Sequence, residues 1–238
     1  YARICRRSKA NMPSVREHPQ VVRDYLAGEC AAGRIAGPLA PAWTDTIQVS
    51  SFGVIPKGTC GKWRLIVDLS SPAGASVNDG IDKELCGLTY ASVDQAADIM
   101  LSLGQGALMA KFDIEHAYRL IPVHPDDHWL LGMQFEDATY VDTVLPFGLR
   151  SAPKLFNAVA DTLEWICRRR GIQHMLHYLD DFFLIGAPHS PECIKSMNIL
   201  RSVFEELGVP IAEHKTVGPS SMLVFLGISI DAESQMLR

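Results

Sequence analysis

The sequence predicts an α+β fold in which helices cover a mainly antiparallel sheet. Short runs rich in apolar and β-branched residues come in pairs, with turn residues between the two members of each pair. Apolar residues recur at helical spacing in the segments that separate these pairs. The chain shows neither a regular strand–helix–strand period nor a glycine-rich phosphate loop, so the α+β class is favoured.

The first predicted elements are a helix and a β-hairpin. Residues 18–32 carry apolar side chains at helical spacing, and Gly33 begins the glycine- and proline-rich stretch that ends the helix. Residues 52–56 and 63–69 are apolar, β-branched runs separated by KGTCGK, whose two glycines suit a turn. We therefore expect a hairpin with a basic tip.

A helix and a buried strand come next. Residues 92–103 predict a helix that Ser92 caps and Gly104 ends. Its expected buried face consists of Ala96, Ile99, Met100 and Leu103. Residues 107–112 form an apolar run that ends at Asp113, which indicates a buried strand with a carboxylate at its end.

A second hairpin and a long helix are predicted in the middle of the chain. Residues 130–135 and 139–144 are the two strands, joined by a short acidic turn. Residues 152–170 show helical spacing, and Gly171 ends the helix. The face that we expect to be buried consists of Leu155, Phe156, Val159, Leu163 and Ile166.

Three elements complete the prediction. Residues 175–186 read as an apolar hairpin that is interrupted only by two adjacent aspartates. Residues 191–207 predict an amphipathic helix with Ser190 as its N-cap and a proline in its first turn. Residues 222–230 predict one final strand.

Composition limits the class of protein. The net charge of −5 argues mildly against nucleic-acid binding, because phosphate contacts need lysine and arginine. The six cysteines lack zinc-site spacing and no apolar run is long enough to cross a bilayer, so we expect an intracellular protein with reduced thiols, in the cytoplasm or nucleus, and no membrane contact. The local basic clusters, which are also typical of solvated helix ends, are Arg3, Arg6, Arg7 and Lys9, and Arg168 to Arg170.

Two segments place carboxylates where a cation is expected. HYLDDFFLIG sets Asp180 and Asp181 in the middle of an apolar hairpin, where two like charges need compensation once they are desolvated. KFDIEHAYRL sets Asp113 at the end of a buried strand. Three carboxylates from two strands can hold two divalent metal ions. The alternative is an ordinary acidic turn beside an unremarkable strand end.

The segment LPFGLRSAPKLF joins a predicted strand to the long helix. Gly148 allows a ligand to approach the backbone closely, and Ser151 to Pro153 open the helix. The segment is either a platform for a base pair or only a connection. Tyr118, on the turn after Asp113, either lines a nucleotide pocket or fills core space.

Taken in order, these motifs resemble the fingers and palm of reverse transcriptases. The resemblance covers residues 45–231 and rests on IPKGTCGKWRLIVDL, KFDIEHAYRL, LPFGLRSAPKLF, YLDD, GVPIAEHK and FLGISID. It implies a right-hand polymerase palm, an antiparallel sheet backed by helices, with fingers and without a thumb. The phrases LIVDLSSPAGASVNDGI and LPFGLRSAPKLF are most similar to retroelements of the tyrosine-recombinase class (DIRS or Ngaro-like).

The resemblance implies a role for each matching position. Asp113, Asp180 and Asp181, with the backbone of Ile114, match the site of two Mg²⁺ ions, for which Mn²⁺ is a possible substitute. Lys215 matches the lysine that protonates the pyrophosphate leaving group. The positions that match the nucleotide-binding set, with Tyr118 as the gate against a ribose 2′-hydroxyl, are Lys57, Arg64, Ile114, Ala117, Tyr118, Phe147 and Gly148. Those that match the primer grip are Phe225, Leu226 and Gly227.

The implied organisation is a helical N-terminal extension at 1–44, fingers at 45–87 and 123–146, and palm at 88–122 and 147–238. The implied partners are an RNA template, a DNA primer and a dNTP, within a larger polyprotein that carries thumb, RNase H and integration domains. Two rivals stay open: an RNA-dependent RNA polymerase palm, against which the bulky Tyr118 argues, and a degenerate retroelement module that binds nucleic acid without activity.

Overall fold

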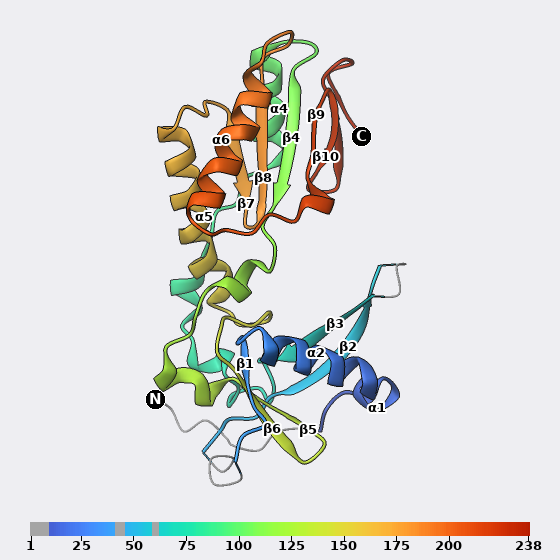
Figure 1. Ribbon diagram of the computed structural model, residues 1–238, viewed down its shortest axis with the longest axis vertical. Coiled ribbons are helices and arrows are strands. Elements are labelled where there is room, and N and C mark those ends of the chain that lie inside the picture. Colours follow the sequence, from blue (N-terminus) through green and yellow to red (C-terminus); the bar gives the residue numbers. More distant parts are fainter. Residues whose placement is uncertain (1–9, 41–45, 59–61) are drawn as a thin grey trace. The chain divides into compact units, whose positions relative to one another are not determined.

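The computed structural model describes residues 10–40, 46–58 and 62–238. Residues 59–61 of the predicted hairpin tip, the basic cluster near the N-terminus and Cys5 lie outside these residues, and Cys60 is one of the three tip residues. The chain forms two compact units: one contains the described residues up to Gly87 together with Tyr118–Pro153, and the other contains Leu88–Ala117 and Lys154–Arg238. Figure 1 labels the elements of each.

The first unit combines a helix, a three-stranded sheet and a two-stranded ribbon. The predicted helix is α2 (Pro19–Ala31), and the second hairpin forms the strands β5 (Gly132–Phe135) and β6 (Ala138–Asp142). Two short elements were not predicted, α1 (Pro13–Glu17) and β1 (Ile35–Ala36), and β1 pairs with β6 to give the sheet order β1-β6-β5. The ribbon pairs β2 (Ser51–Lys57) with β3 (Lys62–Asp68) and confirms the first hairpin.

Two apolar clusters hold the first unit together. One joins α1, α2, the ribbon and the β5-β6 hairpin through buried residues such as Val22, Phe52 and Met133. The other lies around Leu69, Leu145 and Leu149. Short 3-10 helices connect these parts: η1 (Asn78–Gly80), η2 (Lys83–Cys86), η3 (Ala117–Leu120) and η4 (Pro125–Leu130).

The second unit is built on a four-stranded antiparallel sheet with the order β7-β8-β4-β9. Its strands are β4 (Leu108–Asp113), β7 (Met175–Tyr178), β8 (Asp181–Gly186) and β9 (Val217–Ser220). Its helices are α4 (Val93–Leu103), α5 (Ala152–Arg169), which begins at the end of the first unit, and α6 (Glu192–Glu206). The helices and the apolar hairpin predicted from sequence are therefore confirmed.

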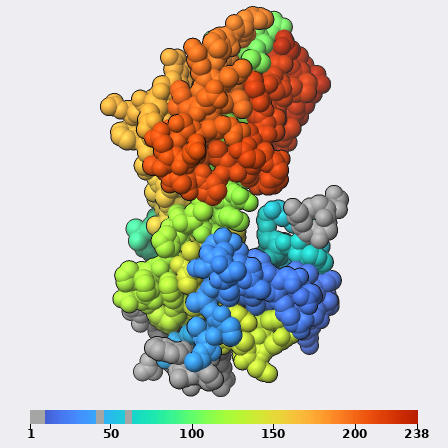
Figure 2. All heavy atoms as spheres, in the orientation of Figure 1, coloured from blue at the N-terminus to red at the C-terminus, as the bar shows by residue number. Residues whose placement is uncertain are grey.

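The two faces of this sheet are covered by different elements. On one face, Met109 and Phe183 pack in a buried cluster with Met100 of α4 and with Phe225 and Ile230. On the other face, the ring of Phe182 meets Phe204 of α6 edge-on, with ring centroids 5.2 Å apart. The surface of this unit that Figure 2 shows consists mainly of the chain that follows α5.

Helix ends follow their local chemistry. Ser92 and Gln95 form a capping box, in which Ser92 Oγ accepts from the Gln95 amide at 3.2 Å and the Ser92 amide donates to Gln95 Oε1 at 3.0 Å. Gly104 ends α4 at a φ of 98°. The predicted cap of α6 was wrong by one residue, because Pro191 occupies the N-cap position and Ser190 precedes it.

Two further expectations were wrong. The predicted strand over residues 222–230 is a hairpin of β10 (Met222–Phe225) and β11 (Ile228–Asp231), and β12 (Met236–Leu237) pairs with β11. Leu226 and Gly227 turn the chain with φ values of 50° and 83°, as a type I′ turn requires. The buried face of α5 is also rotated: Leu155 and Val159 are exposed, whereas the buried apolar residues are Ala152, Phe156, Ala160, Leu163 and Cys167.

In the part of the chain that the structure describes, no helix is both long and apolar enough to span a membrane. The described cysteines, which are Cys30, Cys86, Cys167 and Cys193, are all free thiols.

Candidate active site

Asp113 and Asp181 lie directly opposite each other on β4 and β8. Directly paired residues of antiparallel strands point to the same side of a sheet, with Cβ atoms about 5 Å apart. Met109 and Phe183 are in phase with this pair along the same strands, so the two carboxylates lie on the face covered by α4 and by β10 and β11. The sequence prediction that two strands bring these carboxylates together is met for this pair.

Asp180 lies in the two-residue turn between β7 and β8. Tyr178 pairs with Asp181, and Leu179 has a φ of 53°, a conformation that branched side chains rarely adopt. The carbonyl of Asp180 accepts a hydrogen bond from the Ile114 amide at 3.0 Å, which ties the turn to the end of β4. A strained turn held from outside is typical of functional sites.

Two lysines meet the carboxylates. Lys215 lies in the 3-10 turn η5 (Glu213–Lys215), and its Nζ donates to both oxygens of Asp113 at 2.7 Å. The Ala212 amide also donates to the carbonyl of Asp113 at 2.8 Å, so backbone and side chain fix Lys215 beside β4. Lys111, two residues before Asp113, places its Nζ 3.9 Å from Asp181 Oδ1.

Negative charge remains in excess at this site. Burial, together with the charges of Asp113 and Asp181, raises the pKa of Asp180 to about 6. Burial also raises the pKa of Asp181, and the charge of Lys111 offsets only part of this increase. Burial and like charges disfavour the ionised form of these carboxylates. A cation bound beside them would favour that form.

The donor set suits a hard divalent cation, because it consists of carboxylate oxygens. Within the described residues, however, no three His, Cys, Asp or Glu side chains are arranged as a metal-binding group. Both oxygens of Asp113 are engaged by Lys215. The residue types therefore fit the predicted ions, and the arrangement fits them only if Asp113 exchanges Lys215 for a metal. The number of ions stays a prediction.

Lys57 and Arg64 lie on the same face of the β2-β3 ribbon. Ile55 pairs with Arg64, and Lys57 is two residues beyond Ile55, so the two basic side chains share the face opposite to the buried Val54 and Leu65. Both are exposed. They belong to the first unit and the three aspartates to the second, so their predicted place opposite the aspartates stays a prediction.

The rings of Tyr118 and Phe147 lie next to each other, with centroids 5.2 Å apart and planes tilted by 51°. Tyr118 is half-buried against the cluster around Leu145, and 41% of the surface of Phe147 is exposed. Neither of the two readings of Tyr118 is excluded by this position, since its ring both touches the core and borders an exposed aromatic side chain. Ile114 and Ala117 are buried.

The backbone conformation at position 148 requires a glycine. Its φ of 96° is rarely adopted by other residues, and a Cβ at this position would lie 2.9 Å from the carbonyl oxygen of Val67. The group that lies close to this glycine is the first hairpin of the chain itself, and the approach of a ligand to Gly148 stays a prediction.

Asn78 is a residue that sequence reasoning missed. Its buried amide Nδ2 donates to the Gly148 carbonyl and to Ser70 Oγ, both at 2.9 Å, and its Oδ1 accepts from the Arg150 amide at 2.8 Å. Arg150 in turn donates to the carbonyls of Asn78 and Ile81. Asn78 thus clamps the loop after Phe147, and only its place in a turn-rich segment hinted at such a role.

The predicted primer-grip residues lie at the β10-β11 hairpin. Phe225 is fully buried and stacks on Phe183 of β8, with centroids 4.6 Å apart. Leu226 and Gly227 form the turn, so their backbone lies at the end of this hairpin. Phe183 lies on β8, two residues after Asp181. The stacking of Phe225 on Phe183 therefore packs the β10-β11 hairpin directly against the strand that carries Asp181.

Comparisons with known proteins give a matching family and similar viral polyproteins. The family described as "Reverse transcriptase (RNA-dependent DNA polymerase)" matches residues 55–230. The Pro-Pol polyprotein of feline foamy virus is 27% identical over 184 residues, or 77% of this chain. The genome polyprotein of petunia vein clearing virus (isolate Shepherd) is 28% identical over 127 residues, which are 53% of this chain and 6% of the polyprotein.

Solved structures share the fold. A foamy viral protease–reverse transcriptase in complex with double-stranded DNA matches 98% of this chain with a TM-score of 0.74 and 20% identity. The same kind of protein in complex with an RNA/DNA hybrid matches 98% with a TM-score of 0.72, also at 20% identity, and the chain covers 28% of it. The chain spans 14% of the feline foamy virus polyprotein and 36% of the first of these structures.

Proposed function

Because the chain belongs to the reverse transcriptase (RNA-dependent DNA polymerase) family, we propose that it is the fingers and palm of an RNA-directed DNA polymerase. The proposed reaction transfers a deoxynucleotide from a dNTP to the 3′-hydroxyl of a DNA primer on an RNA template. The observation that carries the proposal is the pair of opposed carboxylates, Asp113 and Asp181, beside the strained turn that holds Asp180.

We assign the metal-binding role to Asp113, Asp180 and Asp181 with the backbone carbonyl of Ile114. When two Mg²⁺ or Mn²⁺ ions are bound, they activate the attacking hydroxyl and neutralise the leaving phosphates. Burial, together with the neighbouring charges of Asp113 and Asp181, raises the pKa of Asp180, and a carboxylate in such surroundings supports this assignment. The carboxylates contribute by position and charge, since phosphoryl transfer of this kind needs no covalent enzyme intermediate.

The remaining residues would bind and orient the substrates. Lys57, as a point charge, and Arg64, as a fork of donors, grip the triphosphate, and their shared exposed face supports a joint role. Lys215 donates a proton to the departing pyrophosphate after leaving Asp113. Tyr118 rejects a ribose 2′-hydroxyl. The other proposed contacts are Ala117, Phe147 and Gly148 with the nucleotide, and Phe225, Leu226 and Gly227 with the primer.

The domain assignment is part of the proposal. Fingers at 45–87 and 123–146 fall in the first compact unit, and most of the palm at 88–122 and 147–238 falls in the second, which supports the division. The extension at 1–44 completes it. The duplexes bound by the related structures support an RNA template and a DNA primer as partners.

The wider context is also proposed. The relatives are polyproteins, which supports an origin in a larger intracellular polyprotein with thumb, RNase H and integration domains. The phrases LIVDLSSPAGASVNDGI and LPFGLRSAPKLF support a retroelement of the tyrosine-recombinase class as its source.

Primer extension tests the proposed function. We expect the chain to extend a DNA primer on a homopolymer RNA template with dNTPs in Mg²⁺ or Mn²⁺, and Asp181→Asn to abolish extension. Asp98→Asn on the exposed face of α4 is the matched control, because it removes the same charge from the same unit. Extension that survives Asp181→Asn would refute the proposal.

A further inference from the structure

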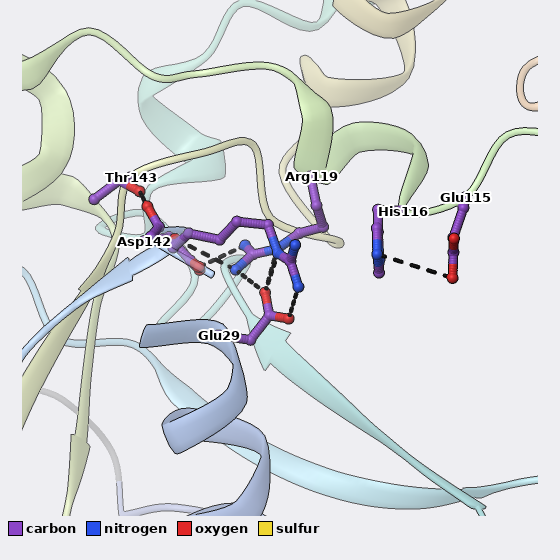
Figure 3. A network of polar contacts seen from close by, with 8 residues as sticks. Glu29, Glu115, His116, Arg119, Asp142 and Thr143 are labelled. Atoms are coloured by element: carbon purple, nitrogen blue, oxygen red, sulfur yellow. Dashed lines mark hydrogen bonds and ion pairs between the residues drawn. The ribbon is translucent and has the colours of Figure 1, made fainter. Parts of the chain in front are cut away.

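Arg119 is almost completely buried and is held by carboxylates from two other segments. Its side chain is 5% exposed. Its Nη1 lies 2.5 Å from Asp142 Oδ1 at the end of β6, and its Nε and Nη2 lie 3.1 and 2.8 Å from Glu29 Oε2 on α2. Figure 3 shows both carboxylates pointing at the guanidinium group. All three residues belong to the first unit.

A second arginine completes the network. Arg34 donates to Glu29 through Nε at 2.9 Å and through Nη2 at 2.5 Å. The Arg34 carbonyl in turn accepts the Thr143 amide at 3.0 Å, next to Asp142. The hydrogen bonds from these two arginines lower the pKa of Glu29, so it is ionised at neutral pH. The C-terminal half of α2 is thereby joined to β6 and to the turn that contains Arg119.

The segments that Arg119 joins lead directly to Tyr118 and Phe147, whose rings line the proposed pocket for the nucleotide sugar. Arg119 follows Tyr118 in η3. The chain after η3 runs antiparallel to the chain after β6: Val123 N donates to Thr143 O and Leu145 N donates to Ile121 O, both at 2.9 Å. Tyr118 and Phe147 thus lie just beyond one end of this ladder, and Arg119 and Asp142 cross-link its two chains.

Stability alone gives little reason for this arrangement. Buried ion pairs regain about what their desolvation costs, and apolar residues of equal volume often stabilise a fold as well. Charged partners instead fix the relative positions of the segments that carry them, because a forked guanidinium donates to carboxylates only in a few orientations. Here the ion pairs of Arg119 fix the position of η3 relative to β6, and with it the position of the Tyr118 ring relative to Phe147.

We propose that Arg119 is a positioning residue for sugar selection, and that Glu29 of the N-terminal helix and Asp142 act through it. The network holds η3 where the Tyr118 ring meets Phe147, so the helical segment before the fingers takes part in choosing deoxynucleotides. This inference rests on the proposed function of Tyr118 as the gate.

The test measures the ratio of kcat/KM for a deoxynucleotide to that for the matching ribonucleotide in single-nucleotide primer extension. Arg119→Met removes the guanidinium group, and Glu29→Gln keeps the shape of the side chain while it removes the charge. We expect both variants to lower the ratio about tenfold, because a misplacement of less than 1 Å is enough for an effect of that size. A purely structural role would change the amount of folded protein and leave the ratio intact.

Two controls separate the possible failures. Arg170→Met breaks a bidentate pair with Glu206 in the second unit and should leave the ratio unchanged. Tyr118→Val should itself lower the ratio. If Tyr118→Val lowers it and folded Glu29→Gln does not, the positioning role is overturned and the gate stands. If Tyr118→Val leaves the ratio unchanged, the gate and the positioning role both fall. Should Arg119→Met not fold, Glu29→Gln decides.

Discussion

The Nζ of Lys215 lies 2.7 Å from each carboxylate oxygen of Asp113, so it occupies the position from which a metal ion would contact Asp113. Lys215 and a divalent cation therefore compete for the same two oxygens. In the proposed reaction, Lys215 would have to leave Asp113 before a metal bound there, and its ammonium group would then be free to meet the leaving phosphates.

This competition predicts opposite effects of one substitution. Lys215→Met should bind Mg²⁺ about fivefold more tightly, as expected when a partly exposed ion pair worth about 1 kcal/mol is removed. It should also extend primers roughly a hundredfold more slowly, because the leaving group loses its acid. Titration calorimetry and rapid-quench extension measure the two effects. Lys195→Met, exposed on α6, is the control, and slower extension without tighter Mg²⁺ binding would contradict the competition.

Asp180→Asn should inactivate the protein and stabilise its metal-free fold. The folded pKa of about 6 lies above the ordinary value of 3.8, so the folded state binds this proton more tightly than the unfolded state. The stability from this group is present below pH 3.8 and is lost as the pH rises through about 6. At pH 7.5 in a chelator, the uncharged variant should therefore be more stable by about 3 kcal/mol.

Urea unfolding at pH 5 and pH 7.5 measures this difference. The wild type should lose stability relative to Asp180→Asn between the two pH values, and Asp98→Asn should follow the wild type. A variant that extends primers normally would show that Asp180 has no catalytic role. If Asp180→Asn is inactive and is less stable than the wild type at pH 7.5, the protein itself compensates the charge of Asp180 without a metal.

The strands and helices around the site could be predicted because each has a local signal. The YLDD hairpin is an apolar run with a polar turn, and α4 carries its capping box in the sequence. The β10-β11 turn has only one local signal, Gly227, because its other residue, Leu226, is unusual at a positive φ. The packing of Phe225 on Phe183 holds the strand that leads into this turn. Tertiary contact overrode the local pattern there.

The site residues also differ in whether the sequence could predict their positions. Asp113 and Asp181 were predictable as strand neighbours, since each ends or begins an apolar run. Asn78 and the partners of Arg119 were not, because a buried amide or ion pair depends on segments far apart in the chain: Asn78 and Gly148 are 70 residues apart, and Arg119 and Glu29 are 90 apart. Hydrophobic periodicity carries no information on such pairs.

Asn78→Ala should destabilise the first unit. The substitution leaves the Gly148 carbonyl and the Arg150 amide without their buried partner, which costs about 2 to 3 kcal/mol. Chemical denaturation measures the loss, and Asn198→Ala on the exposed side of α6 is the control. If nucleotide KM rises in Asn78→Ala protein that is still folded, the clamp also positions the loop for the nucleotide; an unchanged stability would show that water replaces the amide.

Arg64→Ala should weaken nucleotide binding with little effect on the fold, because Arg64 is exposed on the outer face of the β2-β3 ribbon. Loss of a charged hydrogen bond to a phosphate is worth about 2 kcal/mol, so we expect the KM for dNTP to rise roughly thirtyfold with kcat less affected. Steady-state extension measures both. Arg16→Ala in the same unit is the control, and a KM equal to that of the control would mean that the hairpin tip is only a solvated turn.

Tyr118→Val should relax the choice of sugar. In the proposed pocket the ring lies beneath the sugar of the incoming nucleotide, where a 2′-hydroxyl collides with it, and its contact with Phe147 at 5.2 Å fixes its place. A smaller side chain removes the collision. We expect ribonucleotide incorporation to rise on the order of a hundredfold relative to deoxynucleotide incorporation, with some loss of rate from a looser pocket.

The alternative is that Tyr118 serves the core, since it also packs against the cluster around Leu145. In that case Tyr118→Val would lower the free energy of unfolding by about 3 kcal/mol and leave the sugar ratio as it was. Tyr118→Phe separates the two readings further: it keeps the ring, so a steric gate predicts wild-type selectivity in this variant. The gate is wrong if well-folded Tyr118→Val protein discriminates between the two sugars as strongly as the wild type does.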